Sequence, residues 1–114
     1  IYNLKKGIVY AIIYLGDFMI IILSKTFQNQ NILDNVIIMS SKSTLIDDFH
    51  LKTKNEILEF DYLLCDDLSL LDGFENTDIL MDDEPVCNFF GQTSLEHIYI
   101  GNLENSLDHL INGE

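Results

Sequence analysis

The sequence predicts a single α+β domain over residues 1–114, built on an antiparallel or mixed sheet with an N-terminal hairpin and a C-terminal helix. The chain has 114 residues and is 47% hydrophobic, which is enough to bury a core and too apolar for a disordered chain. Short runs of β-branched and aromatic residues recur along it, whereas its last residues place apolar side chains at helical spacing. No internal repeat or linker divides it.

The most hydrophobic run covers residues 8–23 and is interpreted as two strands. A membrane-spanning helix needs about 20 consecutive apolar residues, and Gly16 and Asp17 interrupt this run. Residues 8–15 and 18–23 are rich in β-branched and aromatic side chains, and Gly16 suits the first central position of a type II′ turn. We therefore expect a hairpin whose strands are central in a sheet or buried on both faces, and no membrane as partner.

The middle of the chain predicts short, mixed elements. Residues 25–35 are polar and read as a connection, and residues 36–39 read as a strand. Thr44 and Asp47 have the spacing of a capping box, in which both side chains bond to free N–H groups at a helix start. With apolar residues at helical spacing behind them, they predict a short helix over residues 44–51.

Residues 57–71 fit two alternatives. Leu58, Phe60, Tyr62 and Leu64 alternate with other residues in the manner of a strand, and their aromatic content agrees with it. Other apolar residues in the same range recur at helical spacing after a second possible capping box at residues 53–56. We favour the strand, although a helix would send different carboxylates to solvent.

The end of the chain predicts a loop, a strand and a helix. Residues 72–88 are acidic and contain turn-forming residues, so they read as a long loop. Residues 97–100 read as the last strand. Asn102 is a suitable N-cap for a helix that places Leu103, Leu107, Leu110 and Ile111 on one face.

Charge is distributed unevenly. Residues 1–54 contain all six lysines and four acidic residues, a net charge of +2, whereas residues 55–114 contain fifteen acidic residues and no basic one, a net charge of −15. Such a field accelerates association with a basic partner. The absence of arginine and of clustered lysine argues against binding nucleic acid. The alternative is that the acidity only keeps the protein soluble.

The acidic residues between positions 56 and 84 are interleaved with apolar ones, so the segment is expected to fold and to present a charged face. Loop positions beside apolar residues can reach into a partner's cleft, and aromatic residues ringed by charge are typical central contacts of an interface. The expected partner-binding residues are Tyr62, Asp66, Asp67, Asp72, Phe74, Glu75, Asp78, Asp82, Asp83 and Glu84. Phe89 and Phe90 fit an interface and a core equally well.

No catalytic motif and no cofactor motif is present in the sequence. His50, His97 and His109 are not spaced as metal ligands, and packing or a favourable helix dipole accounts for the last two. Cys65 and Cys87 lack a CxxC arrangement and are expected to be reduced, with a disulfide as the alternative. We expect no enzymatic activity, no cofactor and no metal.

In these features the chain resembles the immunity proteins of bacterial polymorphic toxin systems, such as contact-dependent growth inhibition. Residues 96–100 (EHIYI) and 102–111 (NLENSLDHLI) are similar to the closing strand and helix of several immunity families, SUKH-like ones included. The resemblance implies a cytoplasmic antitoxin that blocks the active site of a basic cognate toxin, a nuclease. It implies no residue roles, because these families share no fixed functional motif.

Two other classes of function stay open. One is a DNA-mimic or regulatory module that binds another basic protein through the same surface. The other is a small enzyme or a calcium-binding module, for which the sequence shows no site.

Overall fold

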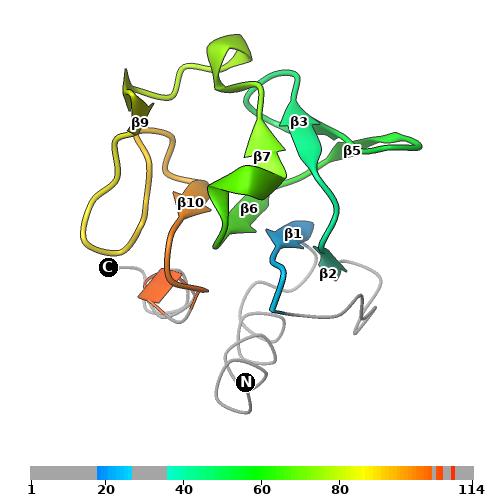
Figure 1. The fold of residues 1–114 in the computed structure, drawn as a ribbon, viewed down its shortest axis with the longest axis horizontal. Coiled ribbons are helices and arrows are strands. Elements are labelled where there is room, and N and C mark those ends of the chain that lie inside the picture. The colour runs from blue at the N-terminus through cyan, green and yellow to red at the C-terminus, as the bar shows by residue number, and fades with distance from the viewer. Residues whose placement is uncertain (1–17, 27–35, 104, 107–108, 110–114) are drawn as a thin grey trace.

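The structure is a computed structural model that describes residues 18–26, 36–103, 105, 106 and 109. Ten short strands and two 3₁₀ turns account for the elements in this part of the chain. The strands form two four-stranded sheets and one two-stranded ribbon (Figure 1).

The first sheet is entirely parallel and is called the parallel sheet below. It consists of β1 (Ile20–Leu23), β2 (Val36–Met39), β6 (Tyr62–Cys65) and β10 (Ile98–Ile100), in the order β10-β6-β1-β2. All four residues of β1 and all three of β10 are buried. Continuous Ile and Leu runs are typical of parallel strands, whose two faces are both covered.

The second sheet, called the mixed sheet below, contains β3 (Ser43–Leu45), β4 (His50–Lys52), β5 (Ile57–Glu59) and β7 (Leu71–Asp72). Its order is β5-β4-β3-β7, with β3, β4 and β5 antiparallel and β7 parallel to β3. Since parallel strands need a long crossover, the chain from β2 to β6 uses its crossover to build most of this sheet.

One hydrophobic core joins the two sheets. Alternate residues of the parallel sheet, among them Ile21, Leu63 and Ile98, belong to the same buried cluster as Leu45 and Leu51 of the mixed sheet. All five side chains are fully buried. The contact explains why the mixed sheet stays folded although its strands have only two or three residues.

Between β6 and β10 the chain carries short elements rather than one open loop. These are η1 (Leu68–Leu70), β7, η2 (Phe74–Asn76), β8 (Met81–Asp82) and β9 (Glu84–Pro85). Gly73 precedes η2 with φ +88°, a left-handed conformation that glycine adopts without strain. The predicted acidic loop is therefore largely structured.

The predicted α+β class is wrong for the part of the chain that the structure describes, because its elements are strands and 3₁₀ turns. After β10, Asn102 Oδ1 accepts the N–H of Asn105 at 3.0 Å, and Leu103, Asn105, Ser106 and His109 have helical backbone conformation. The other residues of the predicted C-terminal helix lie outside the described residues, and no helix is assigned. An antiparallel or mixed sheet exists, but the larger core is built on a parallel one.

The predicted N-terminal hairpin is also wrong. Its first strand, residues 8–15, lies outside the described residues, but both edges of β1 are occupied by β2 and β6. No edge is left for an antiparallel partner. The expectation that residues 18–23 hold a strand central in a sheet is confirmed for β1.

The predicted helix over residues 44–51 is replaced by β3, a turn and β4. Asp47 does not cap a helix, because its Oδ1 accepts the backbone N–H of Phe49 at 2.8 Å and lies 2.9 Å from His50 Nδ1. Thr44 Oγ1 donates instead to Asp72 on the neighbouring strand. Both polar side chains thus satisfy turn and sheet contacts, a known alternative use of capping residues.

The preference for strand in residues 57–71 is confirmed, although two strands in different sheets occupy the range. Thr53, read as a possible helix cap, stabilises the turn before β5, where its Oγ1 accepts the backbone N–H of Glu56 at 3.2 Å. The strands predicted at residues 36–39 and 97–100 are confirmed as β2 and β10.

Candidate functional site

The ten residues predicted to bind a partner fall into groups with different surroundings. Three of them, Asp66, Asp67 and Asp72, bond to other parts of the chain near the carboxyl ends of the parallel strands. Five others, Glu75, Asp78, Asp82, Asp83 and Glu84, are exposed. The two aromatic residues, Tyr62 and Phe74, lie apart from both groups.

Asp66 and Asp67 hold the chain just after β6. Ser24, which is fully buried, donates its hydroxyl to Asp66 Oδ2 at 2.8 Å. Asp67 Oδ1 accepts the backbone N–H of Ser69 at 2.9 Å, and its Oδ2 lies 3.5 Å from Lys25 Nζ. Hydrogen bonds from Ser69, together with the Lys25 charge, lower the pKa of Asp67. These two carboxylates are therefore structural.

Asp72 ties β7 to β3. Thr44 Oγ1 donates to its Oδ1 at 2.5 Å, and Lys42 Nζ lies 3.2 Å from its Oδ2. The hydrogen bond from Thr44, followed by the bond and charge of Lys42, lowers the pKa of Asp72. A carboxylate already satisfied by a hydroxyl and an ammonium has little capacity left for a partner.

The five exposed carboxylates make no ion pair within the described residues, where the ion pairs involve Asp47, Glu59, Asp67 and Asp72. Three of the five, Asp82, Asp83 and Glu84, are consecutive and form the tip of the β8–β9 ribbon. Asp83 occupies the turn with φ 65°, a left-handed conformation that Asp tolerates better than most residues. The negative charge that is free for a partner is thus concentrated in one projecting turn.

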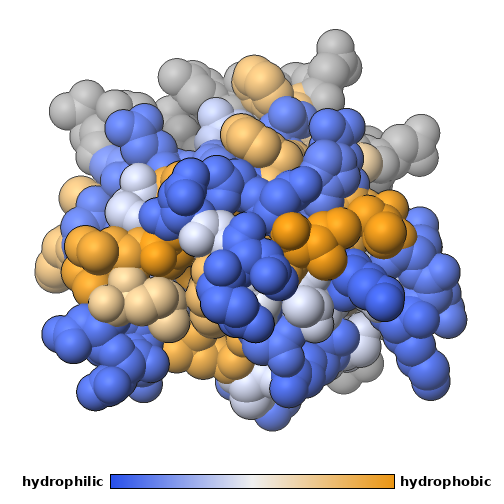
Figure 2. All heavy atoms as spheres, turned by 90° about the horizontal axis from the view of Figure 1, so that it is seen from above, coloured by the Kyte–Doolittle hydropathy of each residue, from blue (hydrophilic) through white to orange (hydrophobic). Residues whose placement is uncertain are grey.

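Apolar side chains flank this acidic tip. Leu80 is 61% exposed, Met81 42% and Val86 43%, and a hydrogen bond from Val86 N to Leu80 O, 3.0 Å long, closes the base of the ribbon. Hydrophobic side chains gather beside hydrophilic ones over this ribbon at the left of Figure 2. The surface formed by residues 80–86 is called the acidic hairpin below.

The aromatic predictions have a mixed outcome. Phe74 is half-buried and packs against the core cluster, so it is not presented as an anchor. Phe89 is instead the most exposed large hydrophobic residue of the described part, at 84%, and packs edge-to-face on Phe90 with ring centroids 5.5 Å apart. Tyr62 is half-buried and lines a cavity.

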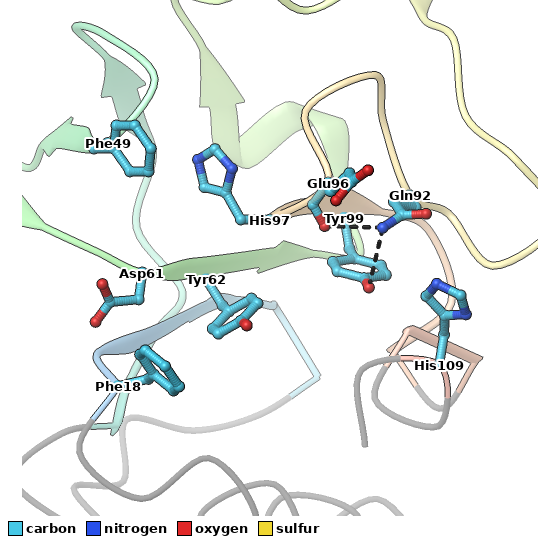
Figure 3. A pocket seen from close by; sticks show the side chains of 9 residues that line it. All are labelled: Phe18, Phe49, Asp61, Tyr62, Gln92, Glu96, His97, Tyr99 and His109. Carbon is cyan, nitrogen blue, oxygen red and sulfur yellow. Dashed lines mark hydrogen bonds between the residues drawn. The ribbon is translucent and has the colours of Figure 1, made fainter. Parts of the chain in front are cut away.

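That cavity has a volume of about 590 Å³, within the usual range of small-ligand sites, and is called the aromatic pocket below (Figure 3). It is enclosed by residues that are far apart in the sequence and meet near the amino ends of β1, β6 and β10. They are Phe18, Phe49, Asp61, Tyr62, Gln92, Glu96, His97, Tyr99 and His109. Only Tyr62 was among the predicted site residues.

One side of the aromatic pocket is built from stacked rings. Phe18 packs edge-to-face on Tyr62 with centroids 5.7 Å apart, and Phe49 stacks on His97 at 4.5 Å with an interplanar angle of 10°. His97 Nε2 lies 2.6 Å from the carbonyl oxygen of Asp48, so Nε2 carries the proton and donates. This bond orients the imidazole at the rim.

The other side holds polar groups around Tyr99. Gln92 Nε2 donates to the Glu96 carbonyl oxygen at 3.0 Å and to the Tyr99 hydroxyl at 3.5 Å (Figure 3). Burial, with smaller contributions from Tyr62 and Glu96, raises the pKa of Tyr99 to about 12. His109 stacks on Phe90 at 4.3 Å, and its buried Nδ1 has no hydrogen-bond partner within the described part of the chain.

Sequence reasoning missed the pocket because no local pattern marks it. His97 and His109 were expected to serve packing, and each does stack on a phenylalanine. Gln92 and Glu96 are ordinary polar residues in the sequence. A pocket assembled from separated segments becomes visible only when the strand order is known.

Comparison of the chain with protein-family models, curated proteins and solved structures finds no match. The residues that the structure describes include no helix long and apolar enough to cross a membrane. They also include no group of three or more His, Cys, Asp or Glu side chains placed to hold a metal ion. Cys65 and Cys87 are both free thiols.

Proposed function

We propose that this protein is an immunity protein that binds a basic toxin domain, a nuclease, through the acidic hairpin and blocks its active site. The observation that carries the proposal is the hairpin tip, where Asp82, Asp83 and Glu84 are consecutive, exposed and unpaired among the described residues. Nuclease active sites receive phosphates, and carboxylates can occupy the same basic subsites.

The apolar flanks of the tip support an interface rather than a solvated charge cluster. Protein interfaces combine a desolvated apolar centre with a polar rim, and the centre supplies most of the binding energy. Leu80, Met81 and Val86 provide such a centre next to the charged tip. The proposal places the protein in the cytoplasm, where a nuclease toxin meets its substrate.

The charge of the second half of the chain supports rapid capture of a basic partner. Steering by a −15 segment accelerates encounter at low ionic strength. Since the Debye length falls from about 30 Å at 0.01 M to about 8 Å at 0.15 M salt, association should slow steeply across that range. An association rate that does not depend on salt would contradict steering.

The test is comparative affinity capture from the native host. Wild-type protein, the triple variant Asp82→Asn/Asp83→Asn/Glu84→Gln and the control Glu56→Gln are used as baits. Glu56 is an exposed carboxylate on the β4–β5 turn, outside the acidic hairpin. We expect a basic protein that the wild type and the control retain and the triple variant loses.

The captured protein is then purified and assayed for nuclease activity with and without its inhibitor. We expect wild-type protein to inhibit the nuclease and the triple variant to bind it at least tenfold more weakly, which corresponds to about 1.4 kcal/mol. Equal binding by the triple variant would refute the acidic hairpin as the interface. A basic partner without nuclease activity would favour the alternative, a DNA-mimic or regulatory module for another basic protein.

A further inference from the structure

We infer that the aromatic pocket is a binding site for an organic cation, specifically a guanidinium group. The inference goes beyond the proposed function, because the pocket contains no residue of the acidic hairpin. It rests on the charge of the lining, on its aromatic rings and on the unsatisfied hydrogen-bond acceptors around the cavity.

The charged side chains that line the pocket are carboxylates. Asp61 and Glu96 contribute negative charge, and the lining contains no lysine or arginine. Asp61 Oδ2 accepts the backbone N–H of Met19 at 2.7 Å, which holds the carboxylate in place while its second oxygen stays available. Both acidic residues are exposed at the rim. This charge pattern favours a cation and disfavours an anion.

The aromatic rings suit a cation that is weakly hydrated. Phe18, Phe49, Tyr62 and Tyr99 supply ring surfaces around the cavity (Figure 3). Guanidinium stacks on aromatic rings and loses its hydration more easily than an ammonium does. A metal ion would need converging ligands, and no group of three His, Cys, Asp or Glu side chains within the described residues provides them.

The polar atoms of the pocket match a group with several donors. A guanidinium has five N–H donors in a plane and no acceptor. The buried Nδ1 of His109 lacks a hydrogen-bond partner among the described residues. As an acceptor, it can take one donor of a guanidinium whose other N–H groups face the carboxylates. The bound group therefore also satisfies a buried polar atom that would otherwise be costly.

The guanidinium can come from a free small molecule or from an arginine side chain of a protein. We would titrate the protein with two probes, methylguanidinium and the peptide acetyl-Gly-Arg-Gly-amide, and follow backbone and imidazole NMR signals. The peptide in which citrulline replaces arginine is a neutral control of nearly the same shape. A second control peptide carries lysine.

We expect the arginine peptide to bind at least fivefold more tightly than the citrulline and lysine peptides and to shift signals of His97, Tyr99 and His109. Binding of methylguanidinium as well would show that a free cation suffices. Binding of the arginine peptide alone would identify a protein segment as the source. No preference for arginine over citrulline, or equal binding of the lysine peptide, would overturn the inference.

Matched variants link the binding to this pocket. Asp61→Asn keeps an acceptor for the Met19 N–H and removes the charge, and Glu96→Gln changes only the carboxylate. Each should weaken arginine-peptide binding about threefold, as expected for exposed charge pairs. Glu75→Gln removes an exposed carboxylate outside the pocket and should have no effect. Wild-type affinity in the Asp61→Asn/Glu96→Gln double variant would place the binding elsewhere and refute the inference.

The triple variant of the acidic hairpin separates this inference from the proposed function. It should bind the arginine peptide as the wild type does, while it loses the captured partner. If it loses the arginine peptide too, the cation is held by the hairpin and not by the pocket. If the pocket variants lose the peptide and keep the partner, the two sites are independent.

Discussion

His97 donates from Nε2 to the backbone carbonyl oxygen of Asp48 across 2.6 Å, and so joins the start of β10 to the turn between β3 and β4. The two residues are 49 positions apart in the sequence. Phe49 stacks on the same imidazole with ring centroids 4.5 Å apart. One side chain thereby links the parallel sheet to the mixed sheet and shapes the rim of the aromatic pocket.

Replacing His97 should separate these two contributions. His97→Phe keeps an aromatic ring for the stack and loses the hydrogen bond, which should lower the free energy of unfolding by about 1 kcal/mol. His97→Ala loses both contacts and should cost about 2 kcal/mol, because aromatic pairs add roughly 0.5–1.5 kcal/mol. Urea unfolding measures both values. His50→Ala, at an exposed turn-side position, should change stability by less than about 0.5 kcal/mol, and a larger loss there than in His97→Ala would contradict the role of the junction.

Gly73→Ala should destabilise the fold strongly. A Cβ at this position would lie 2.3 Å from the backbone oxygen of Leu45, and the residue has φ +88°. The left-handed conformation alone costs a non-glycine residue about 1–3 kcal/mol, and backbone atoms cannot move aside cheaply. Thermal unfolding of Gly73→Ala and of the control Gly101→Ala gives the comparison. At Gly101, where φ is +139°, the nearest atom lies 3.8 Å away, so equal losses would show that the contact with Leu45 is unimportant.

Acid should weaken the link between β3 and β7 through Asp72. The hydrogen bond from Thr44 and the bond and charge of Lys42 lower the pKa of Asp72 in the folded protein. A carboxyl group whose pKa is lower in the folded than in the unfolded state stabilises the fold above its unfolded pKa of about 3.9. This contribution is lost as the pH falls from about 5 through 3.9 to the folded pKa.

Asp72→Asn should therefore be less stable than the wild type at pH 7 and should lose less stability between pH 7 and pH 3. Urea unfolding across this range measures the difference. Asp82→Asn is the matched control, since Asp82 is exposed and makes no ion pair among the described residues. Identical pH profiles of Asp72→Asn and wild-type protein would show that the Thr44 and Lys42 contacts do not favour the charged form.

The two thiols should differ in reactivity. Burial raises the pKa of Cys65 to about 11, and its Sγ donates to the Asp67 carbonyl oxygen at 3.1 Å. Cys87 is half-buried, and burial and the nearby Glu84 raise its pKa. Because the thiolate is the reactive form, a disulfide reagent at pH 8 should modify Cys87 slowly and Cys65 only after unfolding.

Glu84→Gln should increase the rate at which Cys87 reacts, since it removes a negative charge that opposes the thiolate. Glu75→Gln serves as the control at an exposed carboxylate that does not shift Cys87. Absorbance of the released thiolate reports the rates. Faster modification of Cys65 than of Cys87 in folded protein would contradict the burial found for the two side chains.

Local sequence patterns predicted several strands correctly. Residues 36–39 and 98–100 are apolar and β-rich over the length of one short strand, and no competing helical pattern exists there. The run at residues 18–23 was correctly read as a central strand. What these patterns lack is direction. Period-two alternation does not distinguish a parallel from an antiparallel neighbour, and so the pairing of β1 was predicted wrongly.

Capping residues were misread for a related physical reason. Thr44, Asp47 and Thr53 carry side chains that can satisfy backbone N–H groups in helices and turns alike. In this fold they bond to β7, to the β3–β4 turn and to the β4–β5 turn. The choice between these uses depends on which strands the core holds together, and the neighbouring residues do not encode it.

The sequence by itself determined the large negative charge of the second half and the absence of a catalytic motif, because both are properties of composition and short spacing. Only the tertiary structure decided which carboxylates are available. It pairs Asp67 with Lys25 and Asp72 with Lys42, and it exposes Asp82, Asp83 and Glu84 in one turn. It also brings distant segments together around the aromatic pocket, since strand order, which sets these neighbours, depends on long-range burial in the core.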